Sequence, residues 1–222
     1  QVMRLKEEDE VTLVFDDGIK RLARVVDVET RQFELVEELD DNVELPIQVT
    51  IASGFPKGDK LEFITQKVTE LGANQIWGFP ADWSVAKWDG KKLGKKVEKL
   101  EKIALGAAEQ SKRNHVPSIT LFEKKADFLA QFDQFDRIVV AYEESAKEGE
   151  SAALIQAVAG LEKGAKLLFI FGPEGGLSPA EIESFEAKGA VLAGLGPRIL
   201  RAETAPLYAL SAISVLLELE RK

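Results

Sequence analysis

Residues 167–208 read LLFIFGPEGGLSPAEIESFEAKGAVLAGLGPRILRAETAPLY and contain one arrangement twice. Each copy is a short apolar run that breaks into a glycine-rich loop and is followed by a helical segment. The apolar runs are 167–171 and 191–195. Short apolar runs bounded by glycine are typical of strands that are buried on both faces of a parallel sheet. Ligands of such sheets bind beyond the carboxyl ends of the strands, so the two glycine loops are the candidate site.

The helix after the first loop has clear sequence signals. Ser178 is expected as its N-cap, Pro179 at its first position and Glu181 as the partner that closes a capping box. Gly189 is expected to end it. Neither glycine loop matches a known phosphate-binding signature. A single Gly-Gly pair is more often an ordinary turn, but two such loops that flank one helix and carry proline and charged residues favour a ligand site.

The two loops also resemble a known family. GPEGGLS at 172–178 and LGPRILRAETA at 195–205 are similar to motifs of the bacterial RsmE-type enzymes. These enzymes are SPOUT methyltransferases, which use S-adenosylmethionine to methylate N3 of a uridine in 16S ribosomal RNA of the small subunit. Further similarity occurs in KGDKLEFITQKVTELG at 57–72 and EQSKR at 109–113, so the resemblance covers essentially the whole chain.

The resemblance implies an α/β fold: a SPOUT methyltransferase domain over residues 45–222, with a C-terminal trefoil knot. It implies a partial PUA-like β-barrel over residues 1–44, which binds RNA. Because the first residue is Gln1 and not Met, we expect this barrel to be incomplete at its N-terminus. The resemblance further implies a cytoplasmic homodimer whose cofactor is S-adenosylmethionine, whose partner is 16S ribosomal RNA or the assembled small subunit, and which needs no metal.

The resemblance also implies roles for individual residues. The residues expected to bind the cofactor are Gly172, Pro173, Glu174, Gly175, Gly176, Leu195, Gly196, Leu200 and Ala205. Those expected to contact RNA are Gln110, Ser111, Arg113 and Arg198. Arg201, Arg113 and Glu203 are expected to be catalytic, because cations favour the anionic form of the base. The proton acceptor stays open between Glu203 and Glu174.

The residues themselves leave simpler alternatives open. Arg201 and Glu203 can form a local ion pair that only orders the loop. Arg113 can complement the negative end of the preceding helix. Trp83 can pack in a loop or stack on a base. The enzyme can act on another RNA or atom, or the chain can be an inactive RNA- or ribosome-binding protein.

Composition narrows the function classes. The absence of cysteine excludes disulfides and thiolate metal sites, and a single histidine, His115, excludes a histidine-based metal centre. The net charge of −9 counts against a nucleic-acid partner, because phosphate neutralisation supplies much of the affinity for such a partner. Lysine is nevertheless concentrated between residues 87 and 113. That run is either a solvated helix face or a phosphate-binding surface.

The remaining pattern predicts two kinds of architecture. Residues up to about 45 read as antiparallel strands at 11–15, 19–28 and 32–36, with a hairpin turn at 16–18 and a linker at 37–43. From there the chain alternates between strands and helices, which predicts a mostly parallel sheet. The predicted strands are 47–52, 75–79, 118–121 and 137–141, and the predicted helices are 60–71, 93–111, 126–132, 152–159 and 205–219. Asp59 and Glu62 are expected to cap the first helix, and the last helix is apolar enough to need two buried faces.

Overall fold

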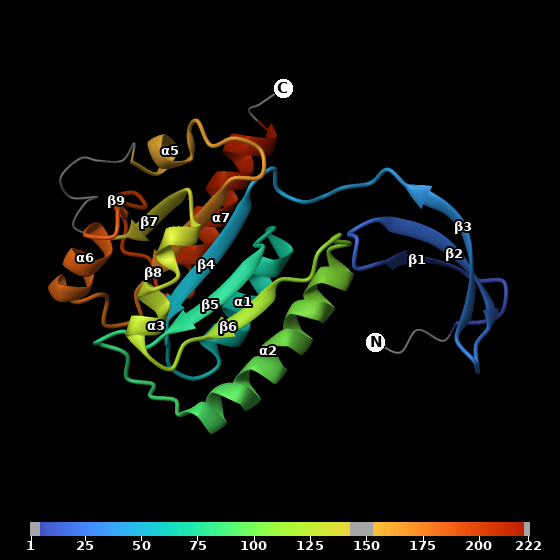
Figure 1. Ribbon diagram of the computed structural model, residues 1–222, viewed down its shortest axis with the longest axis horizontal. Helices are drawn as coiled ribbons and strands as arrows, with labels where there is room; N and C mark the ends of the chain where they lie inside the picture. The colour runs from blue at the N-terminus through green and yellow to red at the C-terminus, as the bar shows by residue number, and fades with distance from the viewer. Residues whose placement is uncertain (1–4, 143–152, 220–222) are drawn as a thin grey trace. The chain divides into compact units, whose positions relative to one another are not determined.

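A computed structural model of the chain describes residues 5–142 and 153–219. The chain divides into two units (Figure 1). The first consists of Gln1–Glu44 together with Lys112–His115, and the second consists of Leu45–Ser111 and Val116–Lys222. The expected helix at 152–159 begins at the edge of the described residues, and its described part is α5 (Ala153–Val158).

The first unit contains a three-stranded antiparallel sheet in the order β1 (Glu10–Val14), β2 (Lys20–Asp27) and β3 (Gln32–Leu39). The predicted hairpin turn is present: the Gly18 N–H donates to the carbonyl of Phe15 at 2.9 Å, and Gly18 has φ +73°, which glycine adopts without strain. β3 continues to Leu39, into the segment expected to be a linker, because Leu39 still pairs with Lys20 of β2.

The second unit is built on a six-stranded sheet in the order β6-β5-β4-β8-β7-β9, in which all neighbouring strands are parallel. The strands are β4 (Gln48–Gly54), β5 (Gln75–Phe79), β6 (Ser118–Leu121), β7 (Arg137–Ala141), β8 (Lys166–Phe171) and β9 (Val191–Ala193). The predicted parallel α/β architecture is therefore confirmed. β9 is shorter than expected and ends at Ala193, so more of the chain belongs to the second glycine loop.

Helices cover both faces of this sheet. The central strand β8 shows why: Phe169 and Phe171 belong to one buried cluster, whereas Leu168 and Ile170 belong to the other. Side chains from α1 (Lys60–Glu70), α2 (Gly90–Gln110), α5 and α7 (Ala205–Ser214) complete the first cluster. Those from α3 (Lys125–Leu129), the 3₁₀ turn η1 (Phe132–Gln134) and α6 (Pro179–Glu186) complete the second. The π-helical turn η2 (Val215–Leu219) continues α7.

Capping boxes were predicted at the starts of α6 and α1, and only one of them is formed. At α6 the box is formed: the Ser178 side chain accepts from the Glu181 N–H at 3.2 Å, and the Ser178 N–H donates to the Glu181 carboxylate at 2.9 Å. At α1 the predicted box is wrong. Asp59 has φ −99° and ψ 8° rather than the extended conformation of a capping residue, and its side chain makes no capping bond. Glu62 instead pairs with Lys99 of α2 at 2.6 Å.

Helix α2 begins three residues earlier than the predicted start at 93. Asp89 has an extended backbone, and its carboxylate accepts a hydrogen bond from the Lys92 N–H at 2.9 Å. This cap lies before the first buried residue of the helix, Leu93. Hydrophobic periodicity marks only the buried face of a helix, so it missed an exposed first turn.

Candidate active site at the two glycine loops

Both glycine loops lie at the carboxyl edge of the sheet, because one follows β8 and the other follows β9. The first loop packs tightly on the neighbouring strand: a Cβ on Gly54, the last residue of β4, would lie 2.6 Å from Cδ of Pro173. The loop also closes on itself. The Gly176 N–H donates to the Pro173 carbonyl at 2.9 Å, and Gly176 has φ +79°. Glycine is therefore required at position 54, where a side chain would clash with Pro173, and at position 176, where φ is positive.

The loop between β5 and α2 covers part of the first glycine loop. A Cβ on Gly175 would lie 2.9 Å from Cβ of Trp83 and 3.1 Å from its carbonyl oxygen. A Cβ on Gly176 would lie 4.0 Å from two ring atoms of Trp83, and Trp83 as a whole is 49% exposed. Gly175 thus allows an aromatic side chain to sit directly against the candidate site.

A lysine joins the two glycine loops. Nζ of Lys60, the first residue of α1, lies 3.0 Å from Oε1 of Glu174 in the first loop and 3.0 Å from Oε2 of Glu203 in the second. The backbone N–H of Lys57 donates a further hydrogen bond to Oε1 of Glu174 at 3.1 Å. Two carboxylates and one ammonium leave the cluster with a net negative charge.

The three ionisable groups of this cluster hold one another in their charged forms. Hydrogen bonds to Glu174 and Glu203 raise the pKa of the Lys60 ammonium. Burial alone would raise the pKa of the Glu174 carboxyl, but Lys60 and backbone amides outweigh it and hold that pKa below its usual value. Burial also opposes ionisation of Glu203, yet its backbone amide, Lys60 and the charge of Arg201 lower its pKa.

Lys60 was missed as a site residue by the sequence interpretation. Its side chain reaches residues 114 and 143 positions further along the chain, and no local pattern encodes such contacts. One signal was present: Lys60 opens the helix that follows β4, and β4 is the sheet neighbour of β8. Loops that follow adjacent parallel strands meet at one edge of the sheet.

A second polar cluster fixes the start of α6. Oε1 of the buried Glu181 accepts a hydrogen bond from the Asp82 N–H at 2.9 Å and lies 2.7 Å from Nζ of Lys125. The Ser178 hydroxyl donates to the Asp82 carboxylate at 2.5 Å. Lys125 and Ser178 hold the pKa of Asp82 below its usual value. This cluster anchors Asp82, the neighbour of Trp83, to α6, which is the helix that follows the first glycine loop.

The second loop holds two predicted catalytic residues, Arg201 and Glu203, and one predicted RNA-binding residue, Arg198, and their surroundings differ. Arg198 and Arg201 are exposed, and neither forms an ion pair within residues 5–142 and 153–219. Glu203 has Lys60 as its ion-pair partner. The alternative in which an ion pair with Glu203 occupies Arg201 is therefore not the arrangement seen. Arg201 is exposed and follows Leu200, one of the predicted cofactor-binding residues, in the chain.

The other predicted cofactor residues follow the same edge. Leu195, Gly196 and Leu200 lie in the second loop, and Ala205 opens α7. Gly196 has φ +90°, and a Cβ there would come within 3.8 Å of the Tyr208 hydroxyl. Through Lys60, the structure brings this loop into contact with residues 172–176 of the first.

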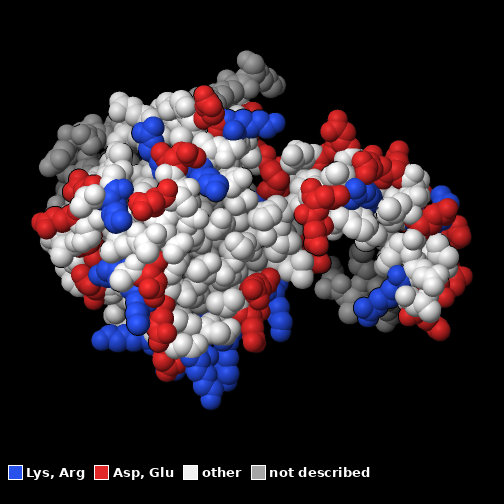
Figure 2. Space-filling model, viewed as in Figure 1, with Lys and Arg blue, Asp and Glu red and all other residues white. Residues whose placement is uncertain are grey.

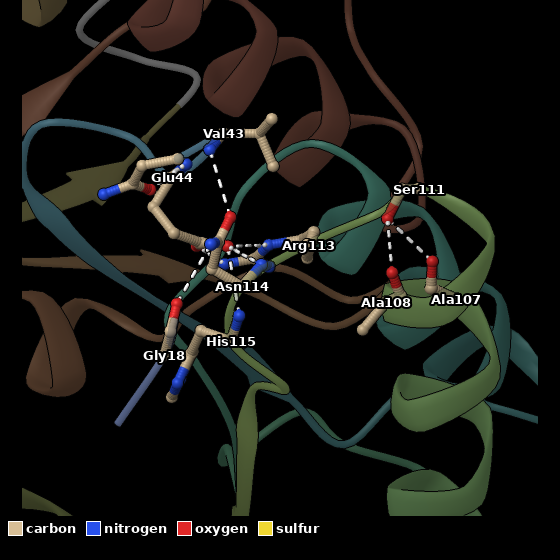
Figure 3. Close-up of polar contacts among 10 residues, drawn as sticks. Gly18, Val43, Glu44, Ala107, Ala108, Ser111, Arg113, Asn114 and His115 are labelled. Carbon is tan, nitrogen blue, oxygen red and sulfur yellow. Dashed lines mark hydrogen bonds and ion pairs between the residues drawn. The ribbon is translucent and has the colours of Figure 1, made fainter. Parts of the chain in front are cut away.

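Arg113 and its ion-pair partner Glu44 both belong to the first unit. Arg113 is 5% exposed, and its Nε donates to Oε1 of Glu44 at 3.1 Å (Figure 3). The same oxygen accepts from the Asn114 N–H at 2.9 Å. Figure 3 also shows the Ser111 hydroxyl turned back onto its own helix, where it donates to the Ala107 carbonyl at 2.7 Å. Gln110, the last residue of α2, is exposed, and the predicted RNA contacts at 110–113 thus fall in two separate units.

No group of three His, Cys, Asp or Glu side chains in the described part of the chain is arranged to hold a metal ion. No helix there is long and apolar enough to cross a membrane.

Comparisons with known proteins place the chain in a family. Residues 43–214 match the RNA methyltransferase domain family, and residues 1–38 match the RNA methyltransferase PUA domain family. Ribosomal RNA small subunit methyltransferase E of Bacillus subtilis is 50% identical over 222 residues, which are 99% of this chain and 87% of that protein.

Solved structures agree with this placement. One crystallised hypothetical protein shares 48% identity and a TM-score of 0.91, over 100% of this chain and 88% of its own. The ribosomal RNA small subunit methyltransferase E of Neisseria gonorrhoeae, crystallised with S-adenosyl methionine, shares 27% identity and a TM-score of 0.81, over 97% of this chain and 86% of its own. The resemblance seen in the two glycine loops is confirmed: the chain belongs to the ribosomal RNA small subunit methyltransferase E family of RNA methyltransferases.

Proposed function

We propose that this protein transfers the methyl group of S-adenosylmethionine to N3 of a uridine in 16S ribosomal RNA. The observation that carries the proposal is the joining of the two glycine loops by Lys60, which forms one continuous site at the carboxyl edge of the sheet. The relative from Neisseria gonorrhoeae supports the cofactor, because it was crystallised with S-adenosyl methionine. The names of the related proteins support the substrate.

The residues of the two loops fit this cofactor chemically. Bound S-adenosylmethionine supplies an electrophilic methyl group on a positively charged sulfur. The cluster of Lys60, Glu174 and Glu203 carries a net negative charge, which favours a cationic ligand at this edge. The glycines of the first loop let backbone amides and carbonyls approach closely. We assign cofactor binding to residues 172–176 together with Leu195, Gly196, Leu200 and Ala205.

We assign activation of the uracil base to Arg201. N3 of uridine carries a proton at neutral pH, so the reaction needs a group that favours the anionic base. The exposed guanidinium of Arg201 has no ion-pair partner among the described residues and can donate two parallel hydrogen bonds to an anion. Glu203 and Glu174 have lowered pKa values and are weak bases for that reason. Either can still take the proton if the arginine lowers the pKa of N3 at the same time.

We assign RNA binding to the first unit, residues 1–44, and to Gln110, Ser111 and Arg198, and methyl transfer to residues 45–222. The match of residues 1–38 to the PUA domain of RNA methyltransferases supports the first assignment. Arg113 is predicted to touch RNA or the base, but its burial against Glu44 favours a structural contribution within the first unit. The cytoplasm, where ribosomal subunits are assembled, is the proposed compartment.

We also propose the finer features of the fold that the family implies. These are a trefoil knot in the C-terminal segment and a PUA-like barrel completed around β1–β3. The path of the chain supports the knot, since β9 lies at the sheet edge beyond β7 whereas α7, which follows it, packs in the same cluster as α1. The proposed homodimer is supported by apolar side chains that α7 and η2 leave exposed, namely Tyr208, Val215 and Leu219. Sedimentation that shows only a 24.4 kDa species at micromolar concentration would exclude the dimer.

The function is tested on the natural substrate. Small ribosomal subunits from a strain that lacks this methylation are incubated with the protein and labelled S-adenosylmethionine, and the RNA is digested to nucleosides. We expect N3-methyluridine as the only labelled product. Label in another nucleoside would show that the enzyme acts on another atom or RNA. Absence of both label and cofactor binding would favour an inactive ribosome-binding protein.

A further inference from the structure

Four lysines gather where helix α2 begins. We call Lys87, Lys91, Lys92 and Lys95 the α2 lysine group, and all four are exposed. Figure 2 shows basic side chains projecting from this end of α2. None of the four forms an ion pair within the described residues. The chain as a whole carries a charge of −9, so this concentration of positive charge is local.

The position of the group is unfavourable for the helix itself. A helix N-terminus carries a partial positive charge and is stabilised by acidic residues. The N-cap Asp89 and Glu123, whose carboxylate lies beside Gly90, supply such charges at the start of α2. The first turn itself contains no acidic residue and holds Lys91 and Lys92. Lys95 follows at the spacing at which helical side chains are neighbours, so like charges also repel. Each such contact costs a few tenths of a kcal/mol. The stability of α2 therefore does not explain the lysines.

The next lysines along α2, Lys96 and Lys99, do have structural roles. Lys99 lies 2.6 Å from Glu62 of α1, and Lys96 lies 3.6 Å from the same carboxylate. Nζ of Lys96 also lies 4.8 Å from the centre of the Trp88 ring. These two lysines are matched to partners inside the unit, whereas the α2 lysine group is turned to solvent.

The α2 lysine group is connected to the glycine loops by a short, anchored segment. Trp83 precedes the group by a few residues and lies against Gly175, with half of its surface exposed. Asp82, next to it, is held by Ser178 and Lys125. An exposed aromatic ring at the candidate site, followed by unpaired lysines, is the combination by which proteins bind single-stranded nucleic acids: the ring stacks on a base and the lysines neutralise phosphates.

We propose that Trp83 and the α2 lysine group form a docking surface for the RNA strand that carries the target uridine, with Trp83 stacking on a base and the lysines contacting phosphates. This inference rests on the proposed function, because it places the substrate strand beside the methyl-transfer site. The positive charge of the α2 lysine group favours a polyanion such as RNA as the ligand, because bound phosphates relieve the repulsion between the lysines. The surface also supplies the local positive charge that an acidic protein needs for binding RNA.

The test separates electrostatic contacts from stacking. The triple substitution Lys91→Ala, Lys92→Ala and Lys95→Ala is expected to weaken binding to naked 16S ribosomal RNA by roughly tenfold or more at about 0.1 M salt. It is also expected to lower the salt dependence of log K by about 2. Trp83→Leu keeps an apolar contact with Gly175, and we expect it to weaken binding by roughly tenfold without changing the salt dependence.

Stability and cofactor binding serve as controls on the same variants. The triple alanine variant is expected to melt no lower than the wild type, because alanine favours helices and removes the repulsion at the helix start. Titration of the triple alanine variant with S-adenosylmethionine is expected to give an unchanged affinity. The matched control Lys163→Ala with Lys166→Ala removes exposed lysines at the opposite edge of the sheet, before and at the start of β8, and is expected to leave RNA binding unchanged.

The outcomes are distinct from those of the proposed function. Wild-type affinity and salt dependence in the triple variant would overturn the docking surface, whatever the wild-type protein methylates. Weaker binding to assembled subunits with unchanged binding to naked RNA would assign the surface to a ribosomal protein and would also overturn it. Failure of the wild type to methylate uridine, with the expected loss of RNA binding in the variants, would refute the proposed function alone.

Discussion

The two units of this protein are stabilised in different ways. The second unit buries two large apolar clusters, one on each face of a six-stranded sheet, and its central strand β8 is covered on both sides. Among the described residues of the first unit, the buried apolar core consists of Val11, Ala23 and Val25, and Leu35 of β3 is 55% exposed. The strands and turns of this unit also carry several ion pairs, such as that of Arg21 with Asp17 at 2.8 Å.

This difference suggests that the two units have different roles. Apolar burial contributes roughly 25 cal/mol per Å², whereas an exposed ion pair contributes about 0–1 kcal/mol and is weakened by salt. We therefore expect the second unit to be the rigid part that holds the reacting groups in place. The first unit is expected to unfold locally more readily, which would suit its proposed role in binding RNA.

Core substitutions test the contrast most strongly. Phe169 of β8 is fully buried and stacks on Phe171 with a centroid distance of 4.7 Å. Phe169→Ala is expected to lower the free energy of unfolding of the second unit by about 3–5 kcal/mol. Leu35→Ala in the exposed sheet is expected to change stability by less than about 0.5 kcal/mol. Denaturant titration followed by hydrogen exchange measures both, and equal effects would remove the distinction between the units.

The chemistry offers the next test, with one arginine from each unit. Arg201→Ala is expected to lower kcat by about 10²–10³ if, as we propose, its guanidinium stabilises charge that develops on the base. Cofactor affinity is expected to change little. Arg201→Lys is expected to recover only part of the rate, since an ammonium lacks the planar fork.

Arg113→Ala is the counterpart in the first unit. It leaves the Glu44 carboxylate without its guanidinium partner, so we expect weaker RNA binding with a nearly unchanged rate at saturating RNA. Single-turnover methylation and cofactor titration on both variants distinguish the cases. If Arg201→Ala loses cofactor binding in proportion to its rate, Arg201 orders the loop and is not catalytic. A large fall in the saturated rate of Arg113→Ala would restore its predicted catalytic role.

A smaller effect is expected at the contact between the glycine loops. Lys60→Met leaves Glu174 and Glu203 without their shared cation, so the loops repel each other, and cofactor affinity is expected to fall roughly tenfold. Lys60→Arg is expected to restore most of it. Lys57→Met is the matched control, because Lys57 contacts Glu174 through its backbone N–H, which the substitution keeps. Equal affinities for Lys60→Met and the control would show that the ion pairs do not shape the site.

The same two units show how far the sequence alone can predict this protein. Strands β5, β6 and β7 begin and end where predicted, because short buried strands have continuous apolar patterns. The capping box at Ser178 was also confirmed, since it depends only on residues three positions apart. The glycine loops were identified from glycine content and from their place after apolar runs.

The errors and omissions concern contacts between distant residues. Lys60 joins two loops more than a hundred residues away, and Arg113 finds Glu44 across 69 positions. Asp59 had a capping residue's neighbours in sequence but not its backbone conformation. In each case the deciding partner or constraint comes from the fold, so no pattern within a window of the chain could reveal it.

The pH dependence of cofactor affinity gives the smallest expected effect, and comparison with the pH dependence of the rate separates binding from chemistry. The pKa of Glu174 and that of Glu203 lie below the usual 4.5, so their contribution to the site is complete above 4.5 and is lost as the pH falls through the lowered values. The pKa of Lys60 lies above the usual 10.5, so its contribution is complete below 10.5 and is lost as the pH rises through the raised value. Between about pH 6 and pH 9 the cluster therefore keeps its charge, and cofactor affinity measured by calorimetry is expected to stay constant. The rate of methyl transfer is expected to rise over the same range, because more of the bound uridine has lost its N3 proton. Cofactor affinity that changes together with the rate would mean that a group in the loops titrates in this window, which the ion pairs of Lys60 exclude.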